Sequence, residues 1–140
     1  MKLLIDANIL LDVLQARRPF VDASSAVWKL CETEKVEGYV SVLTTANLIY
    51  VMRKELDPGK IENILDSLGL IFSFTELTPA DISRAAALRW SDFEDAIQSV
   101  TADRIGAAYI ITRNVHDFSH SKVEAITPVG LIAKIQDSLV

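Results

Sequence analysis

The segment LLIDANILLDVL (residues 3–14) is a run of apolar residues that is interrupted by Asp6 and Asn8. The start of this segment belongs to KLLI (2–5). This short apolar run is typical of strands that are buried on both faces of a parallel sheet. Asp6 therefore stands where this strand ends, and residues 7–15 are predicted to form a short helix. An aspartate in this place can cap that helix or serve metal or phosphate chemistry, and the segment alone leaves both interpretations open.

Predicted strands and helices alternate along the rest of the chain. Strands are predicted at residues 2–5, 39–42, 70–74 and 108–111, with a short fifth at 125–126. Helices are predicted at residues 7–15, 21–34, 44–55, 57–69, 78–90 and 92–105, and a last one begins at Thr127-Pro128. We expect Thr44 or Thr45 to cap the third helix, and Gly38 and Gly69 to end the second and fourth. This alternation predicts a three-layer α/β/α sandwich around a mostly parallel sheet of four or five strands.

The composition limits the class of protein. The chain has 140 residues, half of them hydrophobic, which predicts a single domain over residues 1–140. Its net charge of −5 has the wrong sign for holding nucleic acid by bulk electrostatics, so a phosphate-bearing substrate needs local basic residues or a cation. No apolar run reaches the roughly 20 residues that span a bilayer. The lone cysteine, Cys31, is predicted to lie in the core, and we expect a cytoplasmic protein with no membrane partner.

Three carboxylates, Asp6, Asp95 and Asp117, are predicted to lie at the same edge of the sheet. Asp95 lies in DFEDAIQ (92–98), and Asp117 lies in TRNVHDF (112–118). Carboxylates that approach one another repel unless a cation or a proton neutralises them. Mg²⁺ takes oxygen ligands, usually from one or two carboxylates, and keeps several waters. The joint placement therefore indicates a magnesium site, while a helix cap for Asp6 and an ordinary loop position for Asp117 stay open.

The neighbours of these carboxylates have structural interpretations as well. Asp92 is placed to cap a helix, and Glu94 and Asp95 are then favoured by the positive end of the helix dipole. His116 and His120 lie in a polar loop and are predicted to be solvated rather than metal ligands. The lack of a cluster of Cys and His residues argues against zinc.

Four segments of the chain match one family in order and spacing. IDANILLDVL (5–14), SVLTTANLIYVMRK (41–54), DFEDAIQSVTA (92–102) and ITRNVHDF (111–118) resemble the motifs of PIN-domain nucleases, and the resemblance covers essentially the whole chain. It implies an endoribonuclease that depends on Mg²⁺ or Mn²⁺, most often the VapC-like toxin of a VapBC-type toxin–antitoxin pair. Such an enzyme hydrolyses an RNA phosphodiester bond with a metal-activated water.

The resemblance also assigns roles to individual residues by their position. Asp6 and Asp95 would hold the metal directly, and Asp117 would complete the catalytic carboxylate cluster through water. Asn8 and Asn114 would position the carboxylates and the substrate phosphate, and Thr112 would orient Asp6.

One position departs from the family pattern. Many members carry the sequence S-x-x-T-x-x-E after the second strand, and here Ser41 and Thr44 match but the last position is Asn47. An amide offers an oxygen but no charge, so the attraction for a metal is weaker. Glu94 or Asp92 can compensate as an additional ligand or support. The alternative is a PIN-like module with an impaired metal site that binds RNA or protein.

The remaining candidate residues concern substrate binding and a competing enzyme class. Arg113 is the basic residue adjacent to the acids, so we expect it to contact phosphate, with a solvated surface arginine as the alternative. Trp28 and Trp90 have apolar helical spacing and are predicted to lie in the core or an interface. Phosphatases of the haloacid dehalogenase type also begin with an apolar strand and an aspartate, but their second acid would fall where this chain has Asn8.

The hydrophobic composition indicates protein partners. The mean hydropathy of +0.26 is high for a small domain, so apolar surface is expected to remain around the helices at 44–55 and 57–69. We therefore expect a homodimer. We also expect an antitoxin that presents an arginine or lysine to the carboxylates.

Overall fold

The computed structural model describes residues 1–138, and across these residues it contains one parallel sheet of five strands. The strands are β1 (Lys2–Ile5), β2 (Glu37–Ser41), β3 (Ser73–Thr75), β4 (Tyr109–Ile111) and β5 (Ala125–Ile126). Their order in the sheet is β3-β2-β1-β4-β5, and each neighbouring pair is parallel. The chain builds outward on one side of β1 and then crosses to the other side. The strand order therefore reverses between β1 and β4, which is where ligands bind in sheets of this kind.

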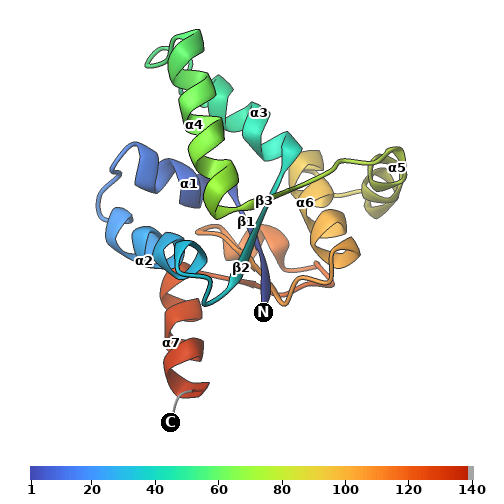
Figure 1. Cartoon of the computed structure of the whole chain (residues 1–140). Coiled ribbons are helices and arrows are strands. Elements are labelled where there is room, and N and C mark those ends of the chain that lie inside the picture. The colour runs from blue at the N-terminus through green and yellow to red at the C-terminus, as the bar shows by residue number, and fades with distance from the viewer. Residues whose placement is uncertain (139–140) are drawn as a thin grey trace.

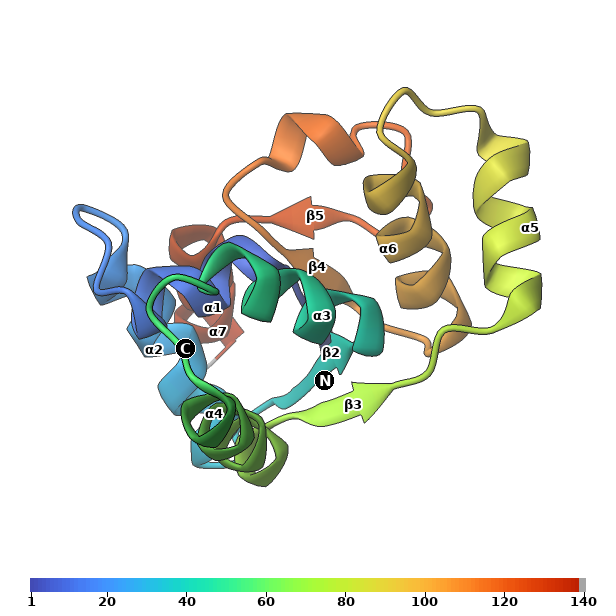
Figure 2. The ribbon, with the colours of Figure 1, turned by 90° about the horizontal axis from the view of Figure 1, so that it is seen from above.

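Helices cover both faces of the sheet (Figures 1 and 2). In the described part of the chain they are α1 (Ala7–Leu14), α2 (Val21–Glu32), α3 (Val42–Val51), α4 (Pro58–Ile71), α5 (Pro79–Leu88), α6 (Phe93–Arg104), α7 (Pro128–Ser138) and the short 3-10 helix η1 (Val115–Phe118). Side chains of α1 to α4 and α7 form the larger core cluster on one face, and α6 packs on the other face with η1. The predicted three-layer α/β/α sandwich is confirmed.

The strand β1 lies at the centre of this sandwich. Leu3, Leu4 and Ile5 have no exposed surface. Leu3 and Ile5 belong to the core cluster beneath α1, whereas Leu4 belongs to the cluster beneath α6. Burial on both faces explains why this strand carries an unbroken apolar run instead of alternating polar and apolar residues.

The boundary between β2 and α3 corrects the predicted cap. The helix begins at Val42, and the backbone N–H of Leu43 donates to Oγ of Ser41 at 3.2 Å. Neither Thr44 nor Thr45 caps it, since both lie inside the helix. The hydroxyl of Thr44 instead accepts a hydrogen bond from Gln98 of α6 at 3.2 Å. This contact connects α3 to α6 next to the carboxyl end of β1.

The predicted strand at 70–74 is wrong at its start. Helix α4 continues through Gly69 to Ile71, and β3 covers only Ser73–Thr75. Leu68 and Phe72 are both buried, and the N–H of Phe72 donates to the carbonyl of Leu68 at 2.8 Å. Burial of these two side chains, one helical turn apart, holds the last turn in place despite the glycine.

Gly38 also has a different role from the predicted one. It lies within β2, and a β-carbon added there would approach Sγ of Cys31 to 2.6 Å and the ring of Phe72 to 2.8 Å. The close packing of α2 and α4 on this strand therefore requires glycine. Cys31 is buried in the core, as predicted, and its burial raises the pKa of the thiol to about 12.

Several predicted helix starts are confirmed. Asp57 accepts from the N–H of Lys60, and Thr78 and Asp81 form a reciprocal capping box at the start of α5. The hydroxyl of Thr127 accepts from the N–H of Gly130. None of the helices in residues 1–138 combines the length and the apolar character needed to cross a membrane.

Candidate functional site

Asp6 follows β1 at the carboxyl end of the sheet, beside β4. Its backbone N–H donates to the carbonyl of Ile111, which continues the pairing of β1 with β4 by one residue. Its carboxylate accepts from the N–H of Ala7 at 2.8 Å, so the predicted role as the cap of α1 is confirmed. The same carboxylate accepts from the hydroxyl of Thr112 at 2.8 Å. A capping role and a place in a polar site therefore occur together.

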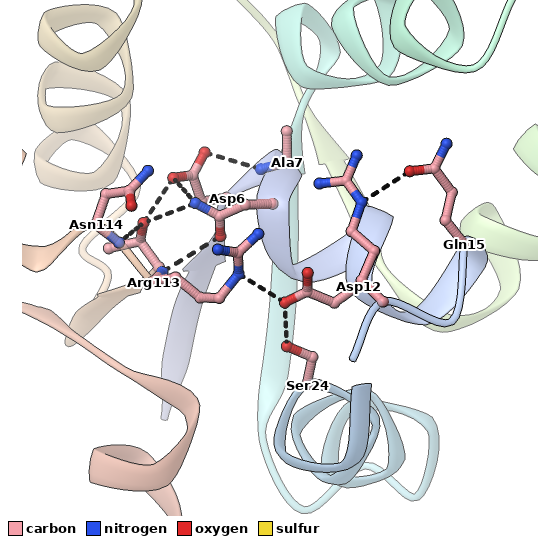
Figure 3. A network of polar contacts seen from close by, with 10 residues as sticks. Asp6, Ala7, Asp12, Gln15, Ser24, Arg113 and Asn114 are labelled. Carbon is pink, nitrogen blue, oxygen red and sulfur yellow. Dashed lines mark hydrogen bonds and ion pairs between the residues drawn. The ribbon is translucent and has the colours of Figure 1, made fainter. Parts of the chain in front are cut away.

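Asn8, Thr112 and Asn114 form a hydrogen-bonded network around this carboxylate (Figure 3). The amide of Asn8 donates to Asp6 at 3.3 Å and to the hydroxyl of Thr112 at 3.2 Å. The backbone N–H of Asn114 donates to the same hydroxyl at 3.0 Å. The hydroxyl of Thr112 thus donates once and accepts twice, which fixes the direction of its bond to Asp6.

The first turn of α6 brings a second group of acids to the same edge. Asp92 caps this helix, as predicted, by accepting from the N–H of Asp95 at 3.1 Å. Nδ2 of Asn47 donates to Glu94 at 3.2 Å. Asn47 stands where the resembling family pattern has a glutamate. Its contact with Glu94 therefore brings a negative charge close to that position.

Two adjoining hollows contain these side chains. A small cavity of about 50 Å³ is lined by residues at the start of α1 and in α3 and α6, among them Asp6, Asn47, Glu94, Asp95 and Gln98. Asp95 also lines a larger cleft of about 710 Å³, together with Asp92, Asp117, His116 and His120. The structure therefore places Asp6 and Asp95 in one cavity, and it places Asp117 beyond Asp95 in the cleft.

The electrostatics of this region follow from its crowding. Burial raises the pKa of Asp95 to about 7, and the negative charges of Asp92, Asp6 and Asp117 add to the effect. Burial also raises the pKa of Asp6, which the hydrogen bonds from Thr112 and Ala7 oppose. Carboxylates in such a position are stabilised in their charged form by a nearby cation.

Gln98 adds a neutral oxygen to this set. It lies three residues after Asp95, on the same side of α6, and only 5% of its surface is exposed. Its Nε2 donates to Thr44, but its Oε1 is buried with no hydrogen-bond partner in residues 1–138. A buried carbonyl oxygen of this kind usually has a water or an ion as its partner.

The donor set suits a hard divalent cation. Within the described residues, no group of three or more Asp, Glu, His or Cys side chains is arranged to hold one ion. Mg²⁺ needs only one or two carboxylates and completes its shell with neutral oxygens and water. The small cavity offers Asp6 and Asp95 as carboxylates and Gln98 as a neutral oxygen. These residues fit Mg²⁺ or Mn²⁺, and they lack the sulfur and nitrogen ligands typical of zinc.

Arg113 has a structural environment of its own. Its Nε lies 2.9 Å from Oδ2 of Asp12, a carboxylate with no exposed surface, and its guanidinium lies 4.0 Å from the ring centre of Phe20. Oδ2 of Asp12 also accepts from the hydroxyl of Ser24 at 2.8 Å. The alternative of a freely solvated arginine is therefore wrong. Its predicted contact with phosphate stays a prediction, although Asp12 already uses one nitrogen of the guanidinium.

The histidines and tryptophans near the site are also placed. His116 and His120 are exposed, as predicted, and both line the larger cleft. Trp90 lines the same cleft, with its ring packed edge-on against Phe118 at a centroid distance of 6.4 Å. Trp28 packs against Phe72 in the core.

The sequence pattern of the PIN domain family matches residues 2–116. This protein belongs to the PIN domain family. The segments of the sequence that resemble this family meet at the edge of the sheet where Asp6, Asp95 and Asp117 lie. No curated protein matches the chain in sequence.

Solved structures share the fold of this PIN domain. VapBC2 from Rickettsia felis, bound to a promoter DNA fragment, has a TM-score of 0.70 at 15% identity, over 91% of this chain and 98% of that one. A toxin–antitoxin complex from Klebsiella pneumoniae has a TM-score of 0.68 at 24% identity, over 89% and 96%. VapBC-1 from nontypeable Haemophilus influenzae has a TM-score of 0.67 at 15% identity, over 92% of this chain and 99% of that one. At these identities the likeness shows the fold.

Proposed function

We propose that this PIN domain protein is a divalent-metal-dependent endoribonuclease and the toxin of a toxin–antitoxin pair. The observation that carries the proposal is the small cavity at the carboxyl end of β1. There Asp6 and Asp95 share the cavity with Gln98, whose buried carbonyl oxygen has no hydrogen-bond partner among the described residues. Membership of the PIN family supports the nuclease activity, and the solved structures named as toxin–antitoxin complexes support the biological setting.

Asp6 and Asp95 would hold Mg²⁺ or Mn²⁺, with Gln98 as a neutral ligand or as the partner of a bound water. When bound, the ion supplies an activated water and stabilises the charge that develops on the phosphate. Thr112 and Asn8 keep the carboxylate of Asp6 in one orientation, since both donate to the same oxygen. Asp117 is exposed on η1, where it can contact substrate-side water in the cleft.

We propose that Glu94 supplies the negative charge that Asn47 lacks. The hydrogen bond from Asn47 brings its carboxylate to the small cavity, which Glu94 also lines. The competing function is a module with an impaired metal site that binds RNA or protein. The bond between Asn47 and Glu94 favours the enzyme, because it brings a negative charge back to the place where the family pattern has one.

Metal titration and an RNA cleavage assay test this function together. We expect the protein to bind Mn²⁺ in calorimetry and to cut RNA only in the presence of Mg²⁺ or Mn²⁺. Asp6→Asn and Asp95→Asn should each abolish cleavage while the protein still unfolds cooperatively. A protein that binds no Mn²⁺ and leaves RNA intact would establish the binding module instead. A mutant that folds normally and still cuts would remove that carboxylate from the site.

Protein partners form the second part of the proposal. Tyr50 and Val51 of α3 and Leu70 of α4 are apolar and 65%, 48% and 88% exposed, in the region where the sequence predicts a contact surface. We propose that this surface supports a homodimer and that a basic antitoxin directs an arginine or lysine to the carboxylates. Light scattering at micromolar concentration tests the dimer, and a strictly monomeric mass would count against it. Co-expression with the protein encoded by the adjacent gene tests the antitoxin.

A further inference from the structure

The cleft beside the carboxylates continues into a longer groove. The hollow of about 710 Å³ that contains Asp95 and Asp117 shares His116 with a second hollow of about 590 Å³. It shares His120 with a third hollow of about 220 Å³, and Lys122 lines both the second and the third. Neighbouring hollows therefore have lining residues in common. We call the three hollows together the lateral groove; its basic and histidine lining residues include Arg89, His116, His120 and Lys122.

The hollows have different walls. The first lies between η1 and the segment that connects α5 to α6, η1 and the loop that follows it line the second, and α5 and α6 line most of the third. The small cavity with Asp6 adjoins the first hollow, because Asp95 lines both. A ligand in the groove would therefore reach the carboxylates directly.

We propose that the lateral groove binds the single-stranded RNA on one side of the scissile bond, with Arg89 and Lys122 contacting its phosphates. This inference rests on the proposed ribonuclease function and assigns the substrate path for it. The exposed histidines and Trp90 line the first hollow together with Arg89, and they supply hydrogen-bond donors and an aromatic edge there. Grooves that follow a single strand combine such cations with aromatic side chains.

The pairing of the arginines distinguishes Arg89 from its neighbours in the fold. Arg84, Arg104 and Arg113 each form an ion pair with an aspartate, so their charges are already compensated. The side chain of Arg89 has no ion pair or hydrogen bond within residues 1–138, and the same is true of Lys122. Both therefore keep their full charge for a ligand. These two cations stand among acidic lining residues, namely Asp92, Asp95, Asp117 and Glu124. In a chain with a net charge of −5, they supply the local positive charge that a polyanion needs.

The backbone at Arg89 is also unusual. The residue ends α5 with φ 58° and ψ 34°, in the left-handed region that favours glycine. Ala16 and Glu34 share this backbone region, so the left-handed conformation alone assigns no role to Arg89. It does mean that glycine can replace Arg89 without straining the turn.

A binding measurement tests the groove separately from catalysis. The probe is a fluorescent, unstructured oligoribonucleotide of about 12 nucleotides, within the site sizes of single-strand binders. Binding is followed by anisotropy in the cleavage-deficient Asp6→Asn protein at several salt concentrations. We expect Arg89→Ala and Lys122→Ala each to weaken binding about three- to tenfold, and to reduce the slope of log K against log salt by about 0.7.

Matched controls separate charge loss from local damage. Arg53→Ala and Lys29→Ala remove exposed cations from α2 and the end of α3, outside the groove, and should leave affinity unchanged. Arg89→Gly removes the charge but relieves the left-handed backbone, so it should lose affinity while unfolding at or above the wild-type temperature. Arg89→Lys keeps the charge and should keep most of the affinity.

The outcomes distinguish the groove from the function on which it rests. Wild-type protein that cuts and binds RNA, with Arg89→Ala and Lys122→Ala indistinguishable from the Arg53→Ala control, would overturn the groove and leave the ribonuclease intact. Wild-type protein that neither binds nor cuts RNA would overturn both. If the two groove variants keep their RNA affinity but lose affinity for a purified cognate antitoxin, the groove is a protein-binding surface and the proposal is wrong.

Discussion

Nε of Arg113 lies 2.9 Å from Oδ2 of Asp12, so a residue that follows β4 is ion-paired to a fully buried carboxylate in α1 (Figure 3). The backbone N–H of the same arginine donates to Oδ1 of Asn8 at 3.3 Å, and Asn8 in turn donates to Asp6. The side chain of Arg113 thus anchors the loop, while its backbone contacts the site. The pair connects the interior of the protein to the orientation of Asp6.

Removal of Asp12 tests this anchoring. Asp12→Ala leaves the guanidinium of Arg113 without its partner in a mostly buried position, so we expect the free energy of unfolding to fall by about 2 to 4 kcal/mol. Asp12→Asn keeps an acceptor for Ser24 and should lose less. Urea denaturation measures both, with Asp22→Ala, an exposed acid of α2, as the control. An Asp12→Ala protein as stable as this control would show that the pair does not anchor the loop.

A second ion pair, in which only the carboxylate is fully buried, joins α5 to α6. Arg104 donates to Asp81, which is 1% exposed, and also to the carbonyl of Glu76 at 2.6 Å. We expect Arg104→Ala to reduce the free energy of unfolding by about 2 to 4 kcal/mol, because it leaves a buried carboxylate unpaired. Arg84→Ala breaks the exposed pair with Asp103 between the same helices and should change stability by about 0.5 kcal/mol or less. Equal losses in the two variants would contradict this account.

The same pair predicts a dependence on acid pH. Burial alone would raise the pKa of Asp81, but hydrogen bonds from the backbone N–H of Thr78 and from Arg104 outweigh it and hold the pKa below its usual value. The folded protein therefore favours the charged form, and the stabilisation is lost as pH falls below about 4. We expect Asp81→Asn to weaken this acid sensitivity, measured by urea unfolding at two pH values. A mutant that loses stability with acid as steeply as the wild type would exclude Asp81 as a source.

Local signals account for the parts of the fold and site that could be predicted. The strand at residues 2–5 is short and apolar, the caps at Asp57 and Thr78 act within one helical turn, and the acids follow strand ends whose edge is set by the parallel sheet. Each of these depends on residues close in sequence. The same reasoning placed Asp6 and Thr112 at one edge, where the structure joins them by a hydrogen bond.

Contacts between distant segments account for what could not be predicted. The apolar residues at 70–74 suit a strand or a helix end, and burial of Leu68 and Phe72 decides for the helix. Asp12 lies in an apolar helix face, which was a visible signal, but its partner is 101 residues away. Gln98 lies three residues after Asp95, a spacing that places both side chains on the same side of α6. Only the packing of α3 against α6 shows that its carbonyl oxygen lacks a partner among residues 1–138.

Metal affinity provides a test of Gln98 and Glu94. If both contribute oxygens to the small cavity, Gln98→Leu and Glu94→Gln should each weaken Mn²⁺ binding by about tenfold, in the range expected for supporting residues of a metal site. Asn47→Glu should tighten binding by adding the charge of the family pattern, unless Glu94 already supplies it. Calorimetry measures all three dissociation constants, and Glu62→Gln on exposed α4 is the control. Affinities that match this control would place both residues outside the reach of the metal.

The carboxyl group of Asp95 should make the metal-free protein sensitive to pH near neutrality. Its pKa in the folded protein is about 7, well above the value of about 3.9 for an unfolded chain, because burial and the neighbouring acids disfavour its charge. The folded state therefore binds the proton more tightly than the unfolded state. The resulting stabilisation is complete below about pH 4 and is lost as pH rises through about 7.

Thermal unfolding in EDTA measures this effect. We expect the metal-free wild type to unfold at a lower temperature at pH 8 than at pH 5.5, and Asp95→Asn to reduce that difference and to unfold at a higher temperature than the wild type at pH 8. Asp103→Asn, near the end of the same helix, is the control and should keep the wild-type dependence. Mg²⁺ should raise the unfolding temperature of the wild type at pH 8, because a cation removes the repulsion that protonation otherwise relieves. An Asp95→Asn protein with the full wild-type dependence on pH would exclude Asp95 as the source of that dependence and contradict its raised pKa.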